Sequence, residues 1–332
     1  MKKIRVAVIG PGRISRAHLN AIRKNADVAK LSYVVGLAHE QERTAALAKE
    51  FGADQASDNL ALTLSDPELD AVVLTVPNHL HREVAIQAMR AGKHVLVEKP
   101  LANSLEDADA MIAEANASGR VLMVAQCRRF FAGAAQAQKR VRELGRPLDI
   151  THVLGVFVDD AKVDWWRSAA KAGGLALGLN GPHVVDTILW LMGELPVRVY
   201  TQTSRLKPEK WEGEDQATVV LTFADGSIAT GHLSLNMPAH VNERWIVGPN
   251  GSMQLTNDRT LTLNGETVVS AELTPYIDGD ESFDGQFREF AMAIGEGRSP
   301  MCSAAELRPV VAVLEAALES ASRNAPIELV AT

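Results

Sequence analysis

The segment at residues 92–102, GKHVLVEKPLA, places a lysine in an unusual setting. Lys99 follows the apolar run Val95–Val97 and Glu98, and Pro100 comes directly after it. Lysine is among the residues least often buried, and a following proline disfavours a helical backbone. An ammonium group held near an oxygen atom stabilises negative charge that develops there. We therefore expect Lys99 to belong to a reaction centre; the alternative is a lysine that extends from a strand end into solvent.

His183 is a second candidate for chemistry, because histidine titrates near neutral pH and can both accept and return a proton. Pro182 places it in the first turn of a predicted helix. Asp186 lies one turn later on the same stripe and could orient the imidazole. It could equally cap the helix or face solvent, and a histidine in a first turn can be an ordinary surface residue.

A glycine-rich turn, GPGRIS at residues 10–15, lies between the first predicted strand and the first predicted helix. This is the context of a dinucleotide-binding fingerprint. Gly10 permits the tight turn, and Gly12 lets the backbone approach a pyrophosphate at the positive end of the helix. Ser15, a small residue, stands in place of the third glycine. The turn predicts a dinucleotide cofactor; the alternative is a strand-to-helix turn without a ligand.

The end of the second predicted strand bears on the choice between NAD and NADP. A carboxylate at this point binds the ribose 2′-hydroxyl of NAD. Here Ala38 and His39 come first, and Glu40 follows. A small residue followed by a basic one favours a 2′-phosphate pocket, so we expect NADP or NAD, with the balance toward NADP. His39, with Arg13 or Arg43, would bind that phosphate; alternatively these are solvated loop residues.

The first 125 residues alternate apolar runs with helical patterns, which predicts βαβ units and a doubly wound parallel sheet of the Rossmann type. One helix is expected to begin at Ser104, with Asp107 three residues later as in a capping box. Another is expected to end at Gly92. The predicted strands are Ile4–Ile9, Leu31–Leu37, Ala71–Val76, Val95–Val97 and Val121–Ala125.

After about residue 150 the pattern changes to alternating runs joined by hairpin signals. Asp225-Gly226, Asn250-Gly251 and Asn264-Gly265 each follow a predicted strand, which indicates an open, mostly antiparallel sheet. We therefore expect an α/β dinucleotide-binding domain at 1–125 and an α+β domain for substrate binding and oligomerisation at 126–332. Helices are predicted at roughly 183–192, 282–294 and 304–323.

Composition excludes several classes of function. Of the 332 residues, 46% are hydrophobic and 23% are charged, which is ordinary for a soluble globular protein. The formal net charge of −7 argues against nucleic-acid and membrane-surface partners, and no apolar run reaches the length of a membrane span. Cys127 and Cys302 form neither a disulfide framework nor a metal spacing, as expected of a reducing, cytoplasmic setting.

Several motifs together resemble one family. They are the turn at 10–15, the stretch TVPNHLH at 75–81, Glu98-Lys99-Pro100, Gly173-Gly174 followed by Asn180-Gly181-Pro182-His183 and Asp186, and the helix FREFAMAIGEGRSP at 287–300. In this order and at these separations they resemble, nearly end to end, the glucose–fructose oxidoreductase and inositol dehydrogenase family, Gfo/Idh/MocA. The resemblance implies a nicotinamide-dependent oxidoreductase that acts on a sugar, a polyol or a related cyclic alcohol or ketone.

The resemblance also implies roles for the motif residues. The stretch Thr75–Asn78 would lie beside the adenosine and the nicotinamide ribose, and Glu98 and Lys99 would flank the nicotinamide. Lys99 would meet the substrate hydroxyl or carbonyl, and His183 would be the general acid/base, while the cofactor carries the hydride. The expected cofactor-binding residues are Gly10, Gly12, Arg13, Ile14, Ala38, His39, Arg43, Thr75, Pro77, Asn78, His81, Glu98 and Lys99.

The sequence departs from the family pattern at Leu179, where many members carry an aspartate. Leucine can neither accept a hydrogen bond nor carry charge, which puts the usual polyol-oxidising arrangement in doubt. Asp159, Asp160 or Asp164 could supply a carboxylate instead; alternatively, the substrate is less hydroxylated or carbonyl reduction is the preferred direction. The expected substrate contacts are Trp166, Arg167, Asn180 and Asp186, with core or surface positions as the alternative for the first two.

Two other functions stay open at this point. One is a redox-neutral NAD-dependent epimerase or glycoside-cleaving enzyme, and the other is a catalytically silent dinucleotide-binding regulatory protein. His79 and His81 form an H-x-H pair, but no cysteine or carboxylate cluster joins them, so we expect no metal site. The second sheet must cover an apolar face, so we expect a homodimer or homotetramer formed through it.

Overall fold

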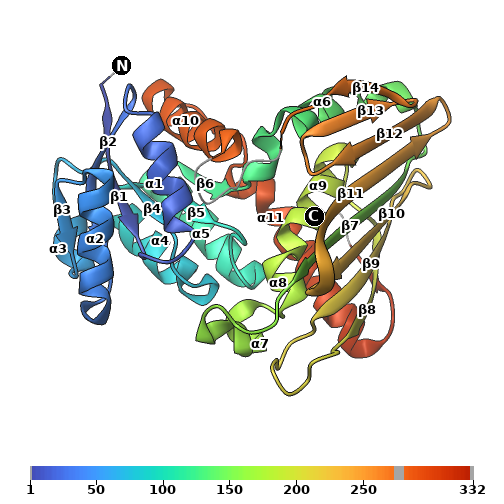
Figure 1. The fold of residues 1–332 in the computed structure, drawn as a ribbon, viewed down its shortest axis with the longest axis horizontal. Coiled ribbons are helices and arrows are strands. Elements are labelled where there is room, and N and C mark those ends of the chain that lie inside the picture. The colour runs from blue at the N-terminus through green and yellow to red at the C-terminus, as the bar shows by residue number, and fades with distance from the viewer. Residues whose placement is uncertain (1, 273–279, 330–332) are drawn as a thin grey trace. The chain divides into compact units, whose positions relative to one another are not determined.

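The structure is a computed structural model that describes residues 2–272 and 280–329. The chain divides into two compact units, and each is discontinuous in sequence (Figure 1). Among the described residues, unit 1 comprises 2–102, 106–130 and 280–308, and unit 2 comprises 103–105, 131–272 and 309–329.

Unit 1 is built on a six-stranded sheet with the strand order β3-β2-β1-β4-β5-β6. All neighbouring strands are parallel, so the carboxyl ends of the strands lie along one edge. The core strands are apolar runs buried on both faces, which is why their positions agree with the prediction. The short edge strand β3 was not predicted, because its sequence QAS carries no apolar run. The strands are β1 (Ile4–Ile9), β2 (Ala29–Val35), β3 (Gln55–Ser57), β4 (Ala71–Leu74), β5 (His94–Glu98) and β6 (Leu122–Ala125).

The helices of unit 1 begin and end where the sequence gives local reasons. α1 buries an apolar stripe that includes Ala17, Ala21 and Ile22, and α2 ends at Gly52, whose φ of 71° is readily adopted by glycine. The helices of this part of the chain are α1 (Ser15–Lys24), η1 (Ala38–Glu40), α2 (Gln41–Phe51), α3 (Leu60–Leu64), η2 (Asn78–Leu80), α4 (His81–Arg90), α5 (Leu105–Ser118), η3 (Cys127–Phe130) and α10 (Glu281–Glu296).

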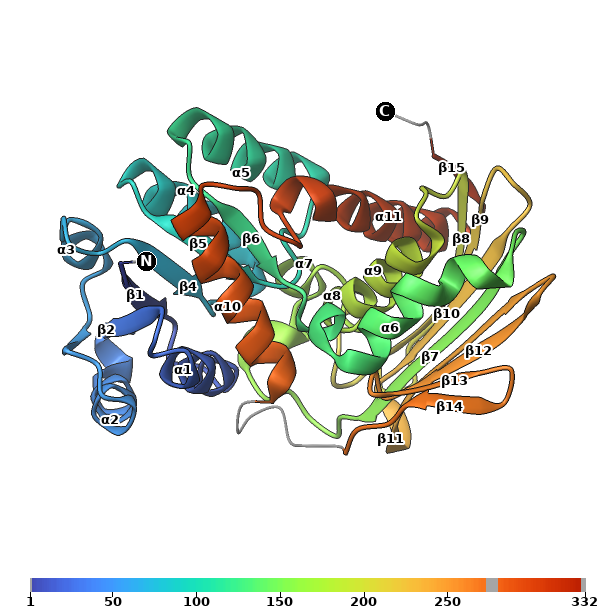
Figure 2. The same cartoon turned by 90° about the horizontal axis from the view of Figure 1, so that it is seen from above.

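α10 belongs to unit 1 although it follows the second sheet in sequence. It packs on α1 and η3, as Figure 2 shows for α1. Its N-terminus is capped by Asp280, whose carboxylate accepts hydrogen bonds from the backbone N–H groups of Ser282 and Phe283. The division of the structure therefore differs from a single boundary after residue 125.

Unit 2 is built on a nine-stranded sheet with the order β14-β13-β12-β11-β7-β10-β9-β8-β15. Among the described strands of this sheet, only β7 and β10 pair in parallel, and the predicted turns at 225–226, 250–251 and 264–265 each join an antiparallel pair. The strands are β7 (Asp149–Phe157), β8 (Arg198–Ser204), β9 (Gln216–Thr222), β10 (Ile228–Ser234), β11 (Asn236–Gly248), β12 (Gly251–Thr256), β13 (Thr260–Leu263), β14 (Glu266–Val269) and β15 (Ile327–Glu328).

Helices of unit 2 cover one face of this sheet (Figures 1 and 2). No helix of the described part of unit 2 covers the opposite face, where Ile228, Trp245 and Val247 are exposed. The remaining helices are α6 (Ala132–Arg140), η4 (Val141–Leu144), η5 (Asp164–Arg167), α7 (Ala169–Ala172), α8 (Ala176–Leu179), α9 (Gly181–Met192) and α11 (Ala304–Arg323), of which α11 contributes to both units.

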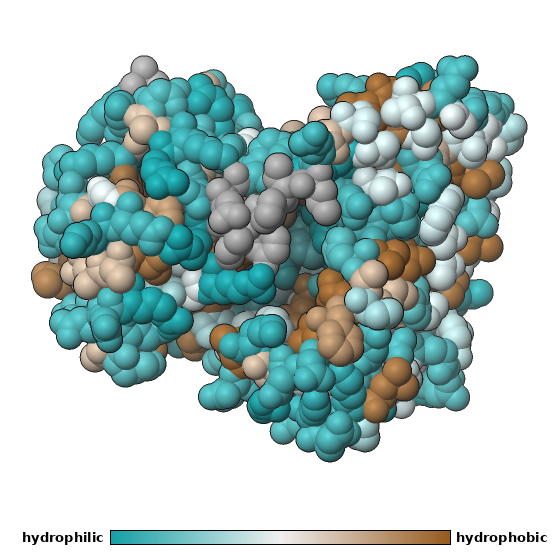
Figure 3. Space-filling view, viewed as in Figure 1, coloured by the Kyte–Doolittle hydropathy of each residue, from teal (hydrophilic) through white to brown (hydrophobic). Residues whose placement is uncertain are grey.

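The surface of unit 1 is mostly hydrophilic on the face drawn in Figure 3, with hydrophobic residues scattered singly. None of the described helices combines the length and the apolar character needed to cross a membrane.

Candidate active site

The turn between β1 and α1 has the shape that a dinucleotide pyrophosphate requires. Gly10 has a φ of 98°, and a Cβ atom placed on it would lie 2.8 Å from the carbonyl oxygen of Thr75. The space beside Gly12 is open, because a Cβ atom added there would meet nothing closer than the carbonyl oxygen of Thr75, at 3.9 Å. α1 begins without a side-chain cap and has no acidic residue in its first turn, so no carboxylate competes with an anion at its N-terminus. The turn therefore fits a dinucleotide phosphate.

Thr75 holds this turn in place from the neighbouring strand β4. Its buried Oγ1 lies 3.0 Å from the carbonyl oxygen of Ile9 and 2.6 Å from that of Gly10. Pro77 and Asn78 follow at the start of η2, and Asn78 is buried. The structure thus gives Thr75 a role in shaping the turn, and direct cofactor contacts by this stretch stay a prediction.

Lys99 lies at the same edge of the sheet as the glycine turn. It follows β5, just as Gly10 follows β1, and β4 lies between the two strands. Its backbone N–H donates to Oε2 of the buried Glu98 at 3.1 Å, and its peptide bond to Pro100 is cis. Burial lowers the pKa of the Lys99 amine, and the Glu98 carboxylate opposes that effect. A buried amine with a lowered pKa at this edge is a candidate for a functional group.

Two buried histidines hold the segment around Lys99. His81, at the start of α4, places Nδ1 at 2.8 Å from the carbonyl oxygen of Pro100 and Nε2 at 3.1 Å from that of Val76. Burial lowers the pKa of His81. His18, in α1, places Nε2 at 2.7 Å from Oε1 of Glu98. His81 is thus a structural link between two carboxyl-edge loops, and its contact with the cofactor stays a prediction.

The loop after β2 carries the residues predicted to select the cofactor. Ala38, His39 and Arg43 are all exposed, in η1 and the first turn of α2. Glu40 turns back on its own loop: Oε2 accepts the backbone N–H of Leu37 at 3.1 Å, and Oε1 accepts from Arg43 at 2.6 Å. Arg13, which is exposed, and Ile14, which is partly buried, lie in the glycine turn itself.

In unit 2, His183 lies in the first turn of α9, as predicted. Its backbone N–H donates to the carbonyl oxygen of Asn180 at 3.1 Å, and its own carbonyl accepts from the Thr187 hydroxyl at 2.8 Å. Asp186, three residues later, is 1% exposed. Nδ2 of Asn180 is buried and has no hydrogen-bond partner among the described residues. The helix start thus offers an imidazole and an amide donor in neighbouring positions.

The segment before His183 is fixed by a half-buried carboxylate that the sequence did not single out. Oε1 of Glu214 accepts the backbone N–H groups of Leu175 at 2.9 Å and Leu177 at 2.8 Å. Burial raises the pKa of Glu214 against these two hydrogen bonds. Gly174 has a φ of 89°, and a Cβ on it would lie 2.9 Å from this carboxylate oxygen. The two-glycine motif therefore makes room for the acid that caps α8.

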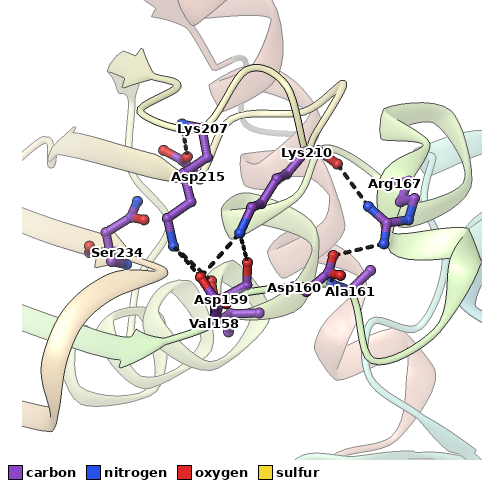
Figure 4. Close-up of polar contacts among 10 residues, drawn as sticks. Val158, Asp159, Asp160, Ala161, Arg167, Lys207, Lys210, Asp215 and Ser234 are labelled. Atoms are coloured by element: carbon purple, nitrogen blue, oxygen red, sulfur yellow. Dashed lines mark hydrogen bonds and ion pairs between the residues drawn. The ribbon is translucent and has the colours of Figure 1, made fainter.

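The acidic residues of the loop after β7 pair with one basic residue of the same segment and one of the loop between β8 and β9 (Figure 4). Asp159 receives the Lys210 amine at 3.1 Å, and Asp160 receives the Arg167 guanidinium at 2.7 Å. The neighbouring Trp166 is half-buried, and its Nε1 has no hydrogen-bond partner in the described chain. Arg167 thus has a carboxylate partner within its own unit, and its contact with substrate stays a prediction.

No group of three or more histidine, cysteine or acidic side chains within residues 2–272 and 280–329 is arranged to hold a metal ion. His79 is exposed, whereas His81 is buried on backbone carbonyls, so the two side chains of the H-x-H pair lie in different environments.

Comparisons with known proteins agree with the fold. Residues 4–126 match the sequence model described as "Oxidoreductase family, NAD-binding Rossmann fold", and residues 133–254 match that of the GFO/IDH/MocA C-terminal domain. The 1,5-anhydro-D-fructose reductase of Ensifer adhaerens is 31% identical over 243 residues, which cover 70% of this chain and 73% of the relative. The 4-carboxy-2-hydroxymuconate-6-semialdehyde dehydrogenase of a Sphingobium species is 29% identical over 313 residues, covering 94% and 96%.

A solved structure of levoglucosan dehydrogenase with NADH and L-sorbose superposes with a TM-score of 0.91 at 25% identity, over 100% of both chains. The parallel sheet and glycine turn of unit 1 and the mixed sheet of unit 2 define a nicotinamide-dependent oxidoreductase. The chain belongs to the Gfo/Idh/MocA family, which confirms the resemblance and the predicted fold class.

Proposed function

We propose that the chain transfers a hydride between a nicotinamide dinucleotide and a sugar, a polyol or a related cyclic alcohol or ketone. The observation that carries the proposal is the position of Lys99, which lies at the strand edge that also bears the glycine turn and has a pKa lowered by burial. Relatives named for 1,5-anhydro-D-fructose and levoglucosan support a cyclic sugar-like substrate.

The proposed mechanism divides the work between Lys99 and His183. When bound, the nicotinamide accepts or supplies the hydride. In the oxidation direction, the Lys99 ammonium stabilises the charge that develops on the substrate oxygen, and the His183 imidazole accepts the hydroxyl proton. In the reduction direction, His183 returns that proton to the carbonyl oxygen. Glu98 balances the Lys99 charge from the preceding residue.

For the substrate, we propose contacts with Trp166, Arg167, Asn180 and Asp186. Two of these residues support it directly, because the Asn180 amide and the Trp166 indole each have a buried donor nitrogen without a partner in the described chain. A buried donor that lacks a partner costs about 1–3 kcal/mol, so a ligand that accepts from it gains affinity. Leu179 is 9% exposed and offers no polar atom, which favours a substrate with one hydroxyl fewer at that position.

For the cofactor, we propose NADP in preference to NAD. Glu40 is the carboxylate nearest in sequence to the end of β2, and its two oxygens are engaged by Leu37 and Arg43. A carboxylate committed in this way is a poor partner for a ribose diol. His39 and Arg43, together with Arg13 of the glycine turn, would then bind the 2′-phosphate beside the small Ala38.

The test is a cofactor and substrate screen with the purified chain. NADP⁺ and NAD⁺ are each supplied with anhydro-sugars, aldoses and inositols, NADPH and NADH are each supplied with the corresponding ketones, and the absorbance of the reduced nicotinamide is followed. Net reduction or oxidation of added cofactor is expected with at least one cyclic sugar-like compound. Lys99→Met should bind the cofactor normally and turn over at least about a hundredfold more slowly.

The same screen separates the two alternatives. An epimerised or cleaved product without net cofactor turnover would favour a redox-neutral enzyme. Cofactor binding without any product would favour a silent dinucleotide-binding protein. Either result contradicts the proposed net oxidoreductase.

We further propose a cytoplasmic homodimer or homotetramer that assembles through the outer face of the second sheet. Val247 and Ile228 flank Asp149 in one row of this face, and Trp245 lies in the next row. These three apolar side chains are 42–50% exposed. Trp245→Glu should shift the mass measured by light scattering toward the monomer; an unchanged mass would contradict this arrangement.

A further inference from the structure

The buried pair between His18 and Glu98 is not part of the roles described so far. Nε2 of His18 lies 2.7 Å from Oε1 of Glu98, and the two side chains come from positions 80 residues apart, on α1 and at the end of β5. His18 is 0% exposed and Glu98 is 8% exposed. The other carboxylate oxygen of Glu98 accepts the backbone N–H of Lys99 at 3.1 Å. One carboxylate thus joins a buried imidazole to the lysine of the proposed reaction.

The surroundings of His18 define which ring nitrogen carries the proton. Nδ1 has no hydrogen-bond partner among the described residues, and the edge of the ring packs against Phe283 of α10, with ring centroids 5.1 Å apart and planes at 86°. A second proton on Nδ1 would be buried without an acceptor, which is costly. Nε2, the nitrogen that faces Glu98, therefore carries the proton and donates to Oε1 of Glu98.

We propose that His18 is a positioning residue of the hydride-transfer reaction. Its Nε2–H group donates a hydrogen bond that keeps Glu98 ionised and oriented. In this state Glu98 accepts the backbone N–H of Lys99 and balances the charge of the Lys99 amine. The inference rests on the proposed function, since it assigns His18 a task only if Lys99 acts on the substrate oxygen. His18 itself touches neither reacting atom in this scheme.

The electrostatic consequence can be followed from group to group. The titratable groups that act on Glu98 are His18 and Lys99, and Glu98 acts in turn on the buried His81. Burial raises the pKa of Glu98, but the His18 hydrogen bond, together with the charge and the backbone N–H of Lys99, outweighs burial and lowers it. Without the His18 donor, burial weighs more heavily, so the Glu98 pKa rises and its ionised form is less favoured.

The Lys99 ammonium then loses the neighbouring negative charge of Glu98, which stabilises it. Burial lowers the Lys99 pKa, the nearby Arg128 lowers it further, and Glu98 and Cys127 oppose them. Removing the Glu98 charge therefore lowers the Lys99 pKa again. If the ammonium form stabilises the substrate oxygen, the alkaline limb of the pH–rate profile moves to lower pH.

The experiment measures kcat and kcat/KM against pH for the full chain and three variants of His18. In His18→Phe, which removes the donor at similar size, we expect the alkaline limb to move to lower pH by at least about one unit, a tenfold change in the protonation equilibrium. His18→Gln can place an amide N–H near the position of Nε2 and should restore most of that shift. His18→Asn is too short to reach Glu98 and should behave like His18→Phe, which keeps the test available if the phenylalanine variant does not fold.

A matched control comes from the opposite end of β5. Nδ1 of His94 accepts the backbone N–H of Val121 at 2.9 Å, and the asparagine side chain in His94→Asn can accept the same bond. That variant should leave the alkaline limb in place. If the alkaline limb of the pH–rate profile stays in place in folded His18→Phe or His18→Asn, whatever the turnover rate of the variant, the positioning role is overturned. Near-normal turnover of Lys99→Met would instead overturn the proposed function, so the two failures are distinguishable.

Discussion

Gly10→Ala should damage unit 1 far more than a glycine substitution with the same backbone strain elsewhere. Gly10 and Gly226 have similar φ angles, 98° and 88°. A Cβ on Gly226 meets nothing within 4 Å, whereas one on Gly10 lies 2.8 Å from the carbonyl oxygen and 2.9 Å from the carbonyl carbon of Thr75. Those atoms belong to backbone next to a buried strand and cannot rotate away.

The magnitude follows from the two costs. An alanine at a positive φ costs about 1–2 kcal/mol at either site. Overpacking against a rigid neighbour adds about 1–3 kcal/mol at Gly10 alone. Gly226→Ala should therefore lower the free energy of unfolding by about 1–2 kcal/mol, and Gly10→Ala by about 2–5 kcal/mol. Because the clash displaces β4 from β1, Gly10→Ala should also weaken dinucleotide binding.

The assay has to report on each unit separately. All five tryptophans lie in unit 2, so tryptophan fluorescence during urea unfolding follows that unit, while hydrogen exchange of the β1 and β4 peptides follows unit 1. Cofactor affinity is measured by titration with the reduced dinucleotide. If Gly10→Ala exchanged and bound like the wild type, or lost no more stability than Gly226→Ala, the contact geometry of the glycine turn would be refuted.

Three further outcomes are expected. Gly12→Val should leave the free energy of urea unfolding within about 0.5 kcal/mol of the wild-type value, because the nearest atom to the added Cβ lies 3.9 Å away. The same variant should raise the dinucleotide Kd at least about tenfold, and a normal affinity would argue against the phosphate site. Arg43→Ala should lower the ratio of kcat/KM for NADP to that for NAD by about tenfold, and an unchanged ratio would remove this loop from cofactor selection. Burial, reinforced by Arg120, lowers the pKa of His94 to about 4. The unfolded state therefore binds a proton between about pH 6.5 and 4 that the folded state does not, and the free energy of unfolding falls as the pH drops through this window. His94→Asn should make this fall less steep, and an equally steep fall would show that another group causes it.

The central sheet of unit 1 could be predicted because its strands are short apolar runs between turn signals. Hydrophobic periodicity reports burial, and parallel strands buried on both faces have nearly continuous apolar sequences. The edge strand β3 could not be found this way, because its residues are exposed or half-buried. Helix α10 was predicted at the correct place in the sequence. An apolar helix face, however, does not indicate which sheet or helix it will pack against.

The residues of the candidate site likewise fall into those that the local sequence identifies and those that it does not. Lys99, the glycine turn and His183 stand in local sequence contexts that suggest chemistry, so they could be named in advance. The partners that fix them could not, because His18 is 80 residues from Glu98, and Glu214 is 37 residues from Leu177. One local signal did exist: His18 lies on the buried stripe of α1 beside Ala17 and Ala21, where a polar ring requires a partner.

The account depends most on the claim that Lys99 and His183 act on one substrate oxygen. Its most direct test is the single-turnover rate of hydride transfer in Lys99→Met, His183→Gln and the double variant. Groups that serve the same transition state show strongly non-additive losses, so the double variant should be slower than the slower single variant by no more than about threefold. A near-normal rate in either single variant, or a double variant in which the two losses multiply, would contradict the account.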